Sequence, residues 1–290
     1  MPEKKLKFYY PLPRFPSVSV TGSNCLLQCS HCKGYYLGQM PDVSSPSKLK
    51  EFCINLEKED GVGLLVSGGS TRDGKVPVEP FLGTLKWVKD NTDLIINLHT
   101  GIISRDEAKQ IAAAGIDVAS VDVVGSGDTL SQVYGVQYSV EKYFDSIRNL
   151  RGEGVCVAPH ICVGLHYGEI RGELKALELV SEIKPETLVL ISLIPTPRTP
   201  MEDVTPPSPD VMAKIIKEAR RLCPESELSL GCMRSRDNKA DIEIESIKTG
   251  VTRMAMASRS TERWAIAHGF KVDRIDGCCA VPDKLLNLKK

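Results

Sequence analysis

Short apolar runs recur along the chain, and most are followed by a longer stretch with helical spacing of apolar residues. The runs are nearly continuous, which is typical of parallel strands buried on both faces. They predict eight strands, at Val18–Thr21, Gly63–Val66, Leu94–Leu98, Val118–Val124, Val155–Leu165, Leu188–Ile194, Leu228–Gly231 and Val251–Ala257. The helical patterns predict helices at Ser104–Ala114, Val140–Glu153, Arg171–Ile183, Pro209–Leu222, Ile242–Thr249 and Thr261–His268.

This alternation of strand and helix indicates the α/β class with a parallel sheet. Eight units in about 250 residues fit a (β/α)8 barrel of the TIM type. The alternative is a partial six-unit barrel with a C-terminal α/β extension. We expect a barrel over residues 17–277, preceded by an N-terminal segment (1–16) and followed by a tail (278–290).

Two helix starts are legible. Ser104 stands three residues before Glu107, which is the spacing of a capping box. Ser208 precedes Pro209, which places a proline at the first helical position after a serine cap.

The composition is that of an ordinary soluble globular protein, with 42% hydrophobic and 26% charged residues. Lys+Arg and Asp+Glu both number 37, so no basic excess favours nucleic acid as a partner. No run is long and apolar enough to predict a membrane span or a signal peptide. The ten cysteines therefore favour metal-binding thiols in a reducing cytoplasm over a disulfide framework.

Three cysteines, Cys25, Cys29 and Cys32, follow the first predicted strand in a C-x3-C-x2-C pattern. Thiolates are soft ligands that select iron–sulfur clusters, zinc or Cu(I). The next cysteine is Cys53, so three local ligands leave one coordination position open. A structural zinc site and an electron-carrying cluster are the alternatives, and both normally use four ligands.

The cysteine pattern and its place after the first strand resemble the signature of the radical S-adenosylmethionine (SAM) superfamily. The resemblance implies that Cys25, Cys29 and Cys32 hold a [4Fe–4S] cluster and that SAM occupies the open iron. Reductive cleavage of SAM, with electrons from an external donor, then yields a 5′-deoxyadenosyl radical. His31 stands where the family often carries a planar residue, and we expect it to pack within the loop.

The same resemblance suggests which strand ends meet SAM and substrate. The Gly-Gly segment after the second strand and the VGL…GE pattern after the fifth are similar to SAM-contacting segments of the family. Candidate SAM contacts are therefore Ser67, Gly68, Gly69, Asp122, Gly164 and Glu169. Candidate substrate contacts are His99, His160, Arg234 and Arg236, since arginines suit a carboxylate.

From Val18 to Gly269 the motifs most resemble biotin synthase and its relatives. Biotin synthase binds an auxiliary [2Fe–2S] cluster through strand cysteines, but the matching places fall near Leu65, Asn97 and Ala158. We therefore expect a different second iron–sulfur cluster, with the tail folded over the barrel mouth; the alternative is free thiols. The candidate ligands are Cys232, Cys278, Cys279 and Cys162, whereas Cys53 and Cys223 are predicted to be buried small hydrophobes.

The nearest resemblance is to the archaeal two-component lipoyl synthases. It implies sulfur insertion into a protein-bound octanoyl chain, with a second radical SAM subunit and a lipoyl-carrier protein as partners. A radical carbon-skeleton mutase of the methylornithine synthase type, which needs no second cluster, is the alternative within the superfamily. A non-enzymatic iron–sulfur or zinc protein is the alternative outside it.

Overall fold

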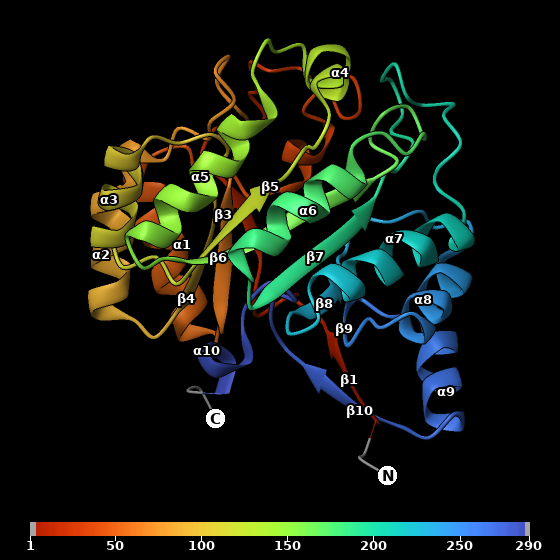
Figure 1. The fold of residues 1–290 in the computed structure, drawn as a ribbon. Helices are drawn as coiled ribbons and strands as arrows, with labels where there is room; N and C mark the ends of the chain where they lie inside the picture. Colours follow the sequence, from red (N-terminus) through yellow and green to blue (C-terminus); the bar gives the residue numbers. More distant parts are fainter. Residues whose placement is uncertain (1–3, 288–290) are drawn as a thin grey trace.

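A computed structural model describes residues 4–287, and its centre is one curled parallel sheet (Figure 1). The strand order is β10-β1-β9-β8-β7-β6-β5-β4-β3-β2. The strands are β1 (Lys4–Tyr9), β2 (Ser17–Ser19), β3 (Gly63–Ser67), β4 (Ile95–His99), β5 (Val118–Asp122), β6 (Cys156–Val163), β7 (Thr187–Ser192), β8 (Glu227–Leu230), β9 (Arg253–Ala255) and β10 (Phe270–Ile275).

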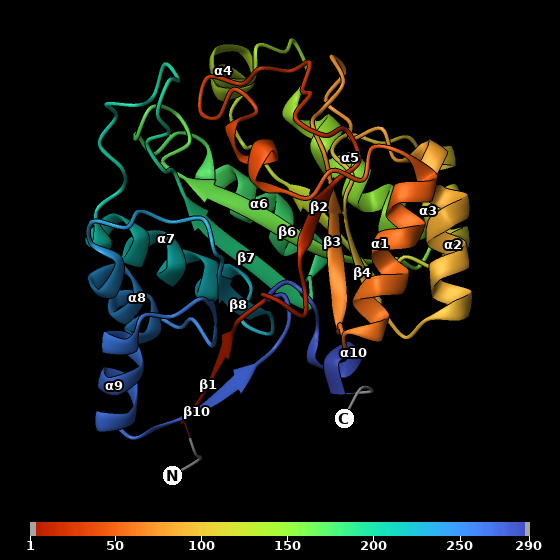
Figure 2. The same cartoon turned by 180° about the vertical axis from the view of Figure 1, so that it is seen from behind.

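The helices cover the outer face of this sheet (Figures 1 and 2). The longer ones are α1 (Pro46–Lys58), α2 (Leu82–Asn91), α3 (Arg105–Ala113), α5 (Val140–Gly152), α6 (Glu173–Ile183), α7 (Pro209–Leu222), α8 (Lys239–Lys248) and α9 (Arg259–Ala267). Shorter ones are η1 (Tyr35–Gln39), η2 (Glu79–Phe81), α4 (Gly127–Thr129), the π-helical turn η3 (Leu130–Tyr134) and α10 (Asp283–Asn287). Their apolar faces and the outward side of the sheet form the largest hydrophobic core.

The prediction of an α/β fold with a parallel sheet is confirmed. All eight predicted strands are present as β2 to β9. The sheet is an open half-barrel with β2 and β10 at its edges, and its last strands form the C-terminal extension of the alternative prediction. The described part of the N-terminal segment is not separate from the sheet, because β1 pairs with both β9 and β10.

The C-terminal segment closes the barrel at the end opposite to the one predicted. Residues 276–287, which we call the plug, place Ala280 and Val281 in an apolar cluster with Ile95 and Val118. Ile95 and Val118 are the first residues of β4 and β5, so this cluster is the floor of the barrel. In Figure 1, α10 accordingly lies below the sheet, far from the loop of α4. The expectation that the tail folds over the mouth is wrong, because Ala280 and Val281 fill an apolar gap at the floor.

The predicted helix starts are confirmed. Ser104 Oγ accepts a hydrogen bond from Glu107 N at 3.3 Å, and Glu107 Oε2 accepts one from Ser104 N at 2.7 Å. Ser208 Oγ accepts from Val211 N at 3.4 Å, with Pro209 at the first helical position. These caps fix where α3 and α7 begin, and therefore where the loops that follow β4 and β7 end.

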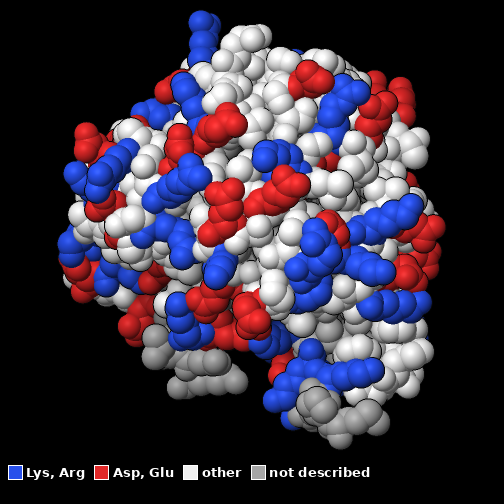
Figure 3. Space-filling view, in the orientation of Figure 1, with Lys and Arg blue, Asp and Glu red and all other residues white. Residues whose placement is uncertain are grey.

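Acidic and basic side chains are interspersed over the face shown in Figure 3, in keeping with a formal net charge of zero. Within residues 4–287, no helix has both the length and the apolar character needed to cross a lipid bilayer.

Replacement of Ser104 by Ala should lower the free energy of unfolding by about 1 kcal/mol, because one half of the capping box is lost. Urea denaturation measures this change. Lys109→Ala, on the exposed side of the same helix, is the control and should stay within about 0.5 kcal/mol of the wild type. An equal loss in both variants would contradict the capping argument.

Candidate functional site

The loop after β2 brings the three motif cysteines to the carboxyl edge of the sheet. Cys29 is buried, whereas Cys25 and Cys32 are partly exposed. The Cys29 thiol donates a hydrogen bond to Cys32, which lowers the pKa of Cys32 to about 4, while the pKa of Cys29 is raised. His31 also lowers the Cys32 pKa, and its own Nδ1 is buried without a hydrogen-bond partner. The thiols of Cys29 and Cys32 are therefore within hydrogen-bond reach of each other.

The end of β3 supports this loop from behind. Gly69 N donates to Thr21 Oγ1 at 2.7 Å, and Leu26 N donates to Ser70 O at 2.8 Å. A Cβ atom on Gly69 would lie 1.9 Å from Asn24 O, so no side chain fits between the strand end and the loop. Of the predicted SAM contacts, Gly69 thus lies directly against the cysteine loop, and Gly68 packs against Val20 and Thr21 just before it.

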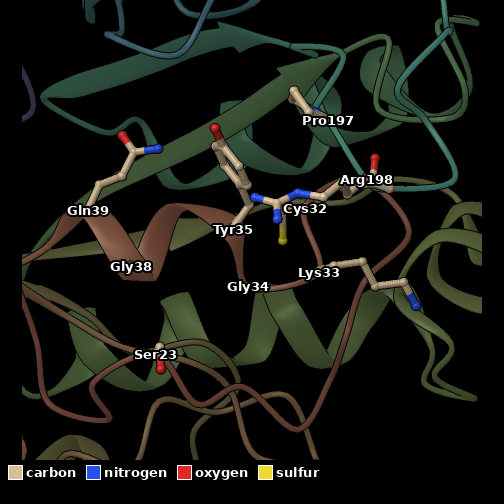
Figure 4. A pocket seen from close by; sticks show the side chains of 10 residues that line it. Ser23, Cys32, Lys33, Gly34, Tyr35, Gly38, Gln39, Pro197 and Arg198 are labelled. Carbon is tan, nitrogen blue, oxygen red and sulfur yellow. The ribbon is translucent and has the colours of Figure 1, made fainter.

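Two cavities meet at Cys32. The outer one has a volume of about 540 Å³ and lies between the cysteine loop and the segment after β7. In Figure 4 the side chain of Arg198 reaches across it toward Tyr35 and Cys32. The inner cavity, which we call the lumen, has a volume of about 270 Å³ and runs inside the half-barrel. Cys32 therefore faces both the entrance and the interior.

The upper lumen gathers three of the predicted polar residues, His99, Asp122 and His160. The two imidazole rings meet edge to face at 6.0 Å. His99 Nδ1 hydrogen-bonds Ser67 Oγ at 3.0 Å, and His160 Nδ1 lies 2.9 Å from the Ala158 carbonyl, to which it donates. Burial lowers the pKa of His99 to about 4 and also lowers that of His160. Both rings are therefore neutral at pH 7, and Asp122 is the one carboxylate among the described lining residues.

The lower lumen gathers three of the predicted second-cluster cysteines. Cys232, at the end of β8, lines the lumen together with Cys278 and Cys279 of the plug. Cys232 is exposed only toward this interior space, and burial with some contribution from Cys279 raises its pKa. A hydrogen bond from Cys279 lowers the pKa of Cys278. Asn97 Nδ2 also approaches Cys278 Sγ at 3.7 Å.

Cys162 does not share that floor cluster. It also lines the lumen, but it packs with the apolar cluster near the mouth, beside residues such as Leu165 and Leu193. Burial raises its pKa, in keeping with a neutral thiol. Cys53 and Cys223 are buried in the outer core as predicted.

Gly164 and Glu169 make contacts within the chain, and neither is among the residues that line the lumen or the outer cavity. A Cβ atom on Gly164 would lie 2.3 Å from Pro207 Cγ, so the glycine makes room for the loop before α7. Its φ of +73° is a second reason for glycine at this place. Glu169 is exposed and pairs with Arg171 at 3.4 Å outside the lumen.

Arg234 is not available to a substrate. It is 3% exposed, and its Nε donates to Glu243 Oε1 at 3.2 Å. Its terminal nitrogens donate to the carbonyl groups of Gly231 and Ala255. The prediction of a substrate contact is therefore wrong, because this guanidinium ties the loop after β8 to α8 and β9. Arg236 is exposed and is absent from the residues that line the lumen.

Two aromatic residues of the lumen were not predicted. Tyr134 lies 5.6 Å from the His31 ring, carried there by η3; π-helical turns often occur at functional sites. Tyr36 donates or accepts a hydrogen bond with Thr196 Oγ1 at 2.8 Å, which joins the cysteine loop to the segment after β7. The one sequence signal was the position of Tyr36, four residues after Cys32.

Within residues 4–287, no three Cys, His, Asp or Glu side chains converge on a position for a single metal ion. A [4Fe–4S] cluster places each thiolate on a separate iron, so its ligands need not converge on one point.

The buried ion pair yields a direct test of its structural role. Arg234→Met should lower the free energy of unfolding by about 3 kcal/mol, because the buried Glu243 carboxylate loses its guanidinium partner and keeps only the longer ion pair with Lys239, at 3.8 Å. Arg236→Met is the matched control and should change it by less than about 0.5 kcal/mol. Denaturant unfolding of the two variants decides; comparable losses would contradict the assignment.

Comparison with known proteins gives consistent results for sequence and fold. No protein-family model matches the chain. The biotin synthase of Prochlorococcus marinus strain MIT 9301 is 25% identical over 232 residues, covering 76% of this chain and 67% of the relative. That of Christiangramia forsetii is 23% identical over 227 residues, covering 76% of this chain and 61% of the relative. The chain thus spans about two thirds of the length of these relatives.

Among solved structures, the maturase HydG of the [FeFe]-hydrogenase superposes with a TM-score of 0.68 at 14% identity, covering 99% of this chain and 69% of that one. Methylornithine synthase superposes with a TM-score of 0.62 at 17% identity, covering 93% and 84%. These two likenesses show the fold alone. Taken with the cysteine loop at the carboxyl edge of a curled parallel sheet, the sequence matches show that the chain is similar to biotin synthases, at about 25% identity.

Proposed function

We propose that this protein is a radical SAM enzyme that inserts sulfur into an uncharged aliphatic chain, as in lipoyl cofactor formation. One observation carries the proposal. The lumen is lined near the mouth by Cys32 and at the floor by Cys232, Cys278 and Cys279, and its walls between them are mainly apolar, with His99, Asp122 and His160 as the polar patch described above. A substrate chain inside it would lie between two groups of thiols.

The residues of the mouth fit a [4Fe–4S] cluster and SAM. Cys25, Cys29 and Cys32 supply three thiolates, and the outer cavity beside Cys32 leaves room for a nucleotide. Bound there, the cluster and SAM supply a 5′-deoxyadenosyl radical that abstracts hydrogen from a C–H bond. The chain's own part is to hold SAM against the loop, through the close approach of Gly69, and to keep water out with Tyr134 and His31.

The floor residues fit a second iron–sulfur cluster that serves as the sulfur source. Cys232, Cys278 and Cys279 are three thiols facing one space, and Asn97 places an amide N–H toward Cys278. Leu65 and Asn97 are positions where the expected biotin-synthase ligands are missing. The plug therefore brings thiols from another part of the chain to the same region of the lumen.

The walls favour an aliphatic substrate without charge. Leu65, Leu165, Val189, Ile191 and Leu193 line the lumen, and none of the described lining residues is lysine or arginine. A free amino acid, the substrate class expected of a methylornithine synthase type of mutase, would bring a carboxylate without a cationic partner there, which is costly. An acyl chain held through an amide brings no such charge.

The proposed partners follow from this substrate. An amide-tethered chain needs a carrier at the mouth, which supports a lipoyl-carrier protein. A second radical SAM subunit and an external electron donor remain predictions that rest on the resemblance to two-component lipoyl synthases.

The activity is tested with anaerobically reconstituted protein, SAM, dithionite and a peptide whose lysine carries a perdeuterated octanoyl group. We expect 5′-deoxyadenosine that contains deuterium, because hydrogen abstraction is measured even when sulfur transfer needs a second subunit. Deuterium transfer from a labelled free amino acid, with none from the octanoyl peptide, would contradict the proposed substrate class.

Iron content tests the second cluster. Wild-type protein should hold about eight irons per chain, and Cys232→Ala, Cys278→Ala and Cys279→Ala should each hold about four, since two cubane clusters bind four irons each. Cys223→Ala, in the outer core, is the control and should keep the full number. A wild-type count of about four would favour a mutase over sulfur insertion.

The close approach of Gly69 to the cysteine loop gives a separate prediction. Gly69→Ala should remove the loop cluster and lower the iron count by about four, because the new methyl group would displace Asn24 and Cys25. Gly38→Ala meets no atom within 4 Å and should bind iron like the wild type. Full iron loading in Gly69→Ala would show that the close approach is not needed.

A further inference from the structure

The plug has little regular secondary structure and is held in place by its contacts with the sheet. Its one helix is α10, and just before that helix Ala280 and Val281 pack into the floor, where they are 1% and 0% exposed. Its two cysteines reach the lumen only because the segment between β10 and α10 is pressed into the open end of the half-barrel. The position of these thiols therefore depends on whatever holds the plug in place.

One carboxylate of the plug meets three donors of the sheet. Asp283 Oδ2 accepts a hydrogen bond from Lys7 Nζ. Asp283 Oδ1 accepts from Tyr9 Oη at 3.0 Å and from Arg253 Nη1 at 3.1 Å. Lys7 and Tyr9 belong to β1, and Arg253 belongs to β9, so a single side chain joins α10 to two neighbouring strands.

Arg253, one of the donors to Asp283, is a buried charge. Its side chain is 0% exposed, and its guanidinium lies 4.6 Å from the centre of the Tyr9 ring. Its guanidinium donates hydrogen bonds to Glu227 on β8, to Asp283, and to the carbonyl oxygen of Val281. Two of these three acceptors come from the plug. A buried guanidinium is stable only when its charge and its N–H groups are paired. Release of the plug would therefore leave Glu227 as the one remaining of these three acceptors, and it would also expose apolar surface.

The seated plug also places Cys278 against a fixed amide. Asn97 Oδ1 accepts from Ser120 Oγ at 2.9 Å, which orients the amide so that Nδ2 faces Cys278 Sγ. Asn97 and Ser120 are 1% and 2% exposed. The thiol thus meets a prepared site in the sheet, and the contacts of Asp283 at the other end of the plug keep it there.

We propose that Asp283 is a positioning residue that locks the C-terminal plug onto β1 and β9 and so holds Cys278 and Cys279 at the floor of the lumen, opposite Cys232. The lock itself depends only on the contacts described above. Its consequence for a second cluster rests on the proposed function. Because Asp283 touches neither substrate nor thiol, it acts through the plug alone.

The lock is tested by thiol alkylation of the iron-free full-length chain, followed by mass spectrometry of each cysteine. Asp283→Ala should raise the alkylation rates of Cys278 and Cys279 by about tenfold, because local opening becomes easier. Asp283→Asn keeps an acceptor oxygen but loses the charge, and its rates should lie between those of Asp283→Ala and wild type. Lys284 lies next to Asp283 on α10, and Lys284→Ala is the matched control. It removes only an exposed ion pair with Glu186 and should leave the alkylation rates within about twofold of the wild type.

Cys53 is the internal control, because it is fully buried on the inner face of α1 and is far from the plug in sequence. Unchanged rates at Cys278 and Cys279 in Asp283→Ala would overturn the lock. A parallel rise at Cys53 would overturn it as well, since general unfolding would then explain the exposure.

Iron content separates the lock from the proposed function. Asp283→Ala should lose about four irons of the floor site after reconstitution and keep those of the cysteine loop. If the wild type itself holds about four irons, the second cluster is wrong, and the alkylation rates still decide the lock. If the wild type holds about eight and Asp283→Ala also holds about eight, the positioning role is wrong while the second cluster stands.

Discussion

Parallel pairing of neighbouring strands brings the carboxyl ends of β2 to β8 to one edge of the sheet, and the curl of the sheet turns those ends toward a shared interior. This constraint explains why residues as distant in sequence as Cys32, His99 and Cys232 line one cavity. It also leaves the opposite end of the half-barrel open and apolar. The plug fills that end, so thiols reach the same lumen from both sides.

No lysine or arginine side chain is among the described residues that line the lumen. The two buried arginines, Arg234 after β8 and Arg253 on β9, are both held in ion pairs. Arg234 pairs with Glu243, and Arg253 pairs with Glu227 and Asp283. Burial keeps His99 and His160 uncharged at pH 7. The same buried pairs connect β8, β9, α8 and the plug, so the groups that remove charge from the cavity also fix its walls.

Much of the fold was predictable because buried parallel strands carry continuous apolar runs. The strands β1 and β10 were missed for a physical reason. β1 begins with two exposed lysines, and β10 is an edge strand that alternates apolar and charged residues as FKVDRI. Neither has the continuous run that identifies a central strand.

The cysteine loop was predictable because its spacing is local. The roles of Gly164, Arg234 and the plug were not, because Pro207, Glu243 and Asp283 determine them through contacts with distant parts of the chain. The sequence predicted Cys278 and Cys279 beside Cys232 but brought them in over the mouth of the barrel, whereas they arrive from the floor. That choice is made by the fit of Ala280 and Val281 to the floor.

The central claim is that sulfur ligands stand at both ends of one cavity and that only the mouth cluster has an iron open to SAM. Electron paramagnetic resonance of the dithionite-reduced, reconstituted protein, titrated with SAM, tests it most directly. The account predicts two reduced-cluster signals, of which one changes on addition of SAM and the other does not. A spectrum that SAM leaves unchanged, or a single signal in fully reconstituted protein, would contradict it.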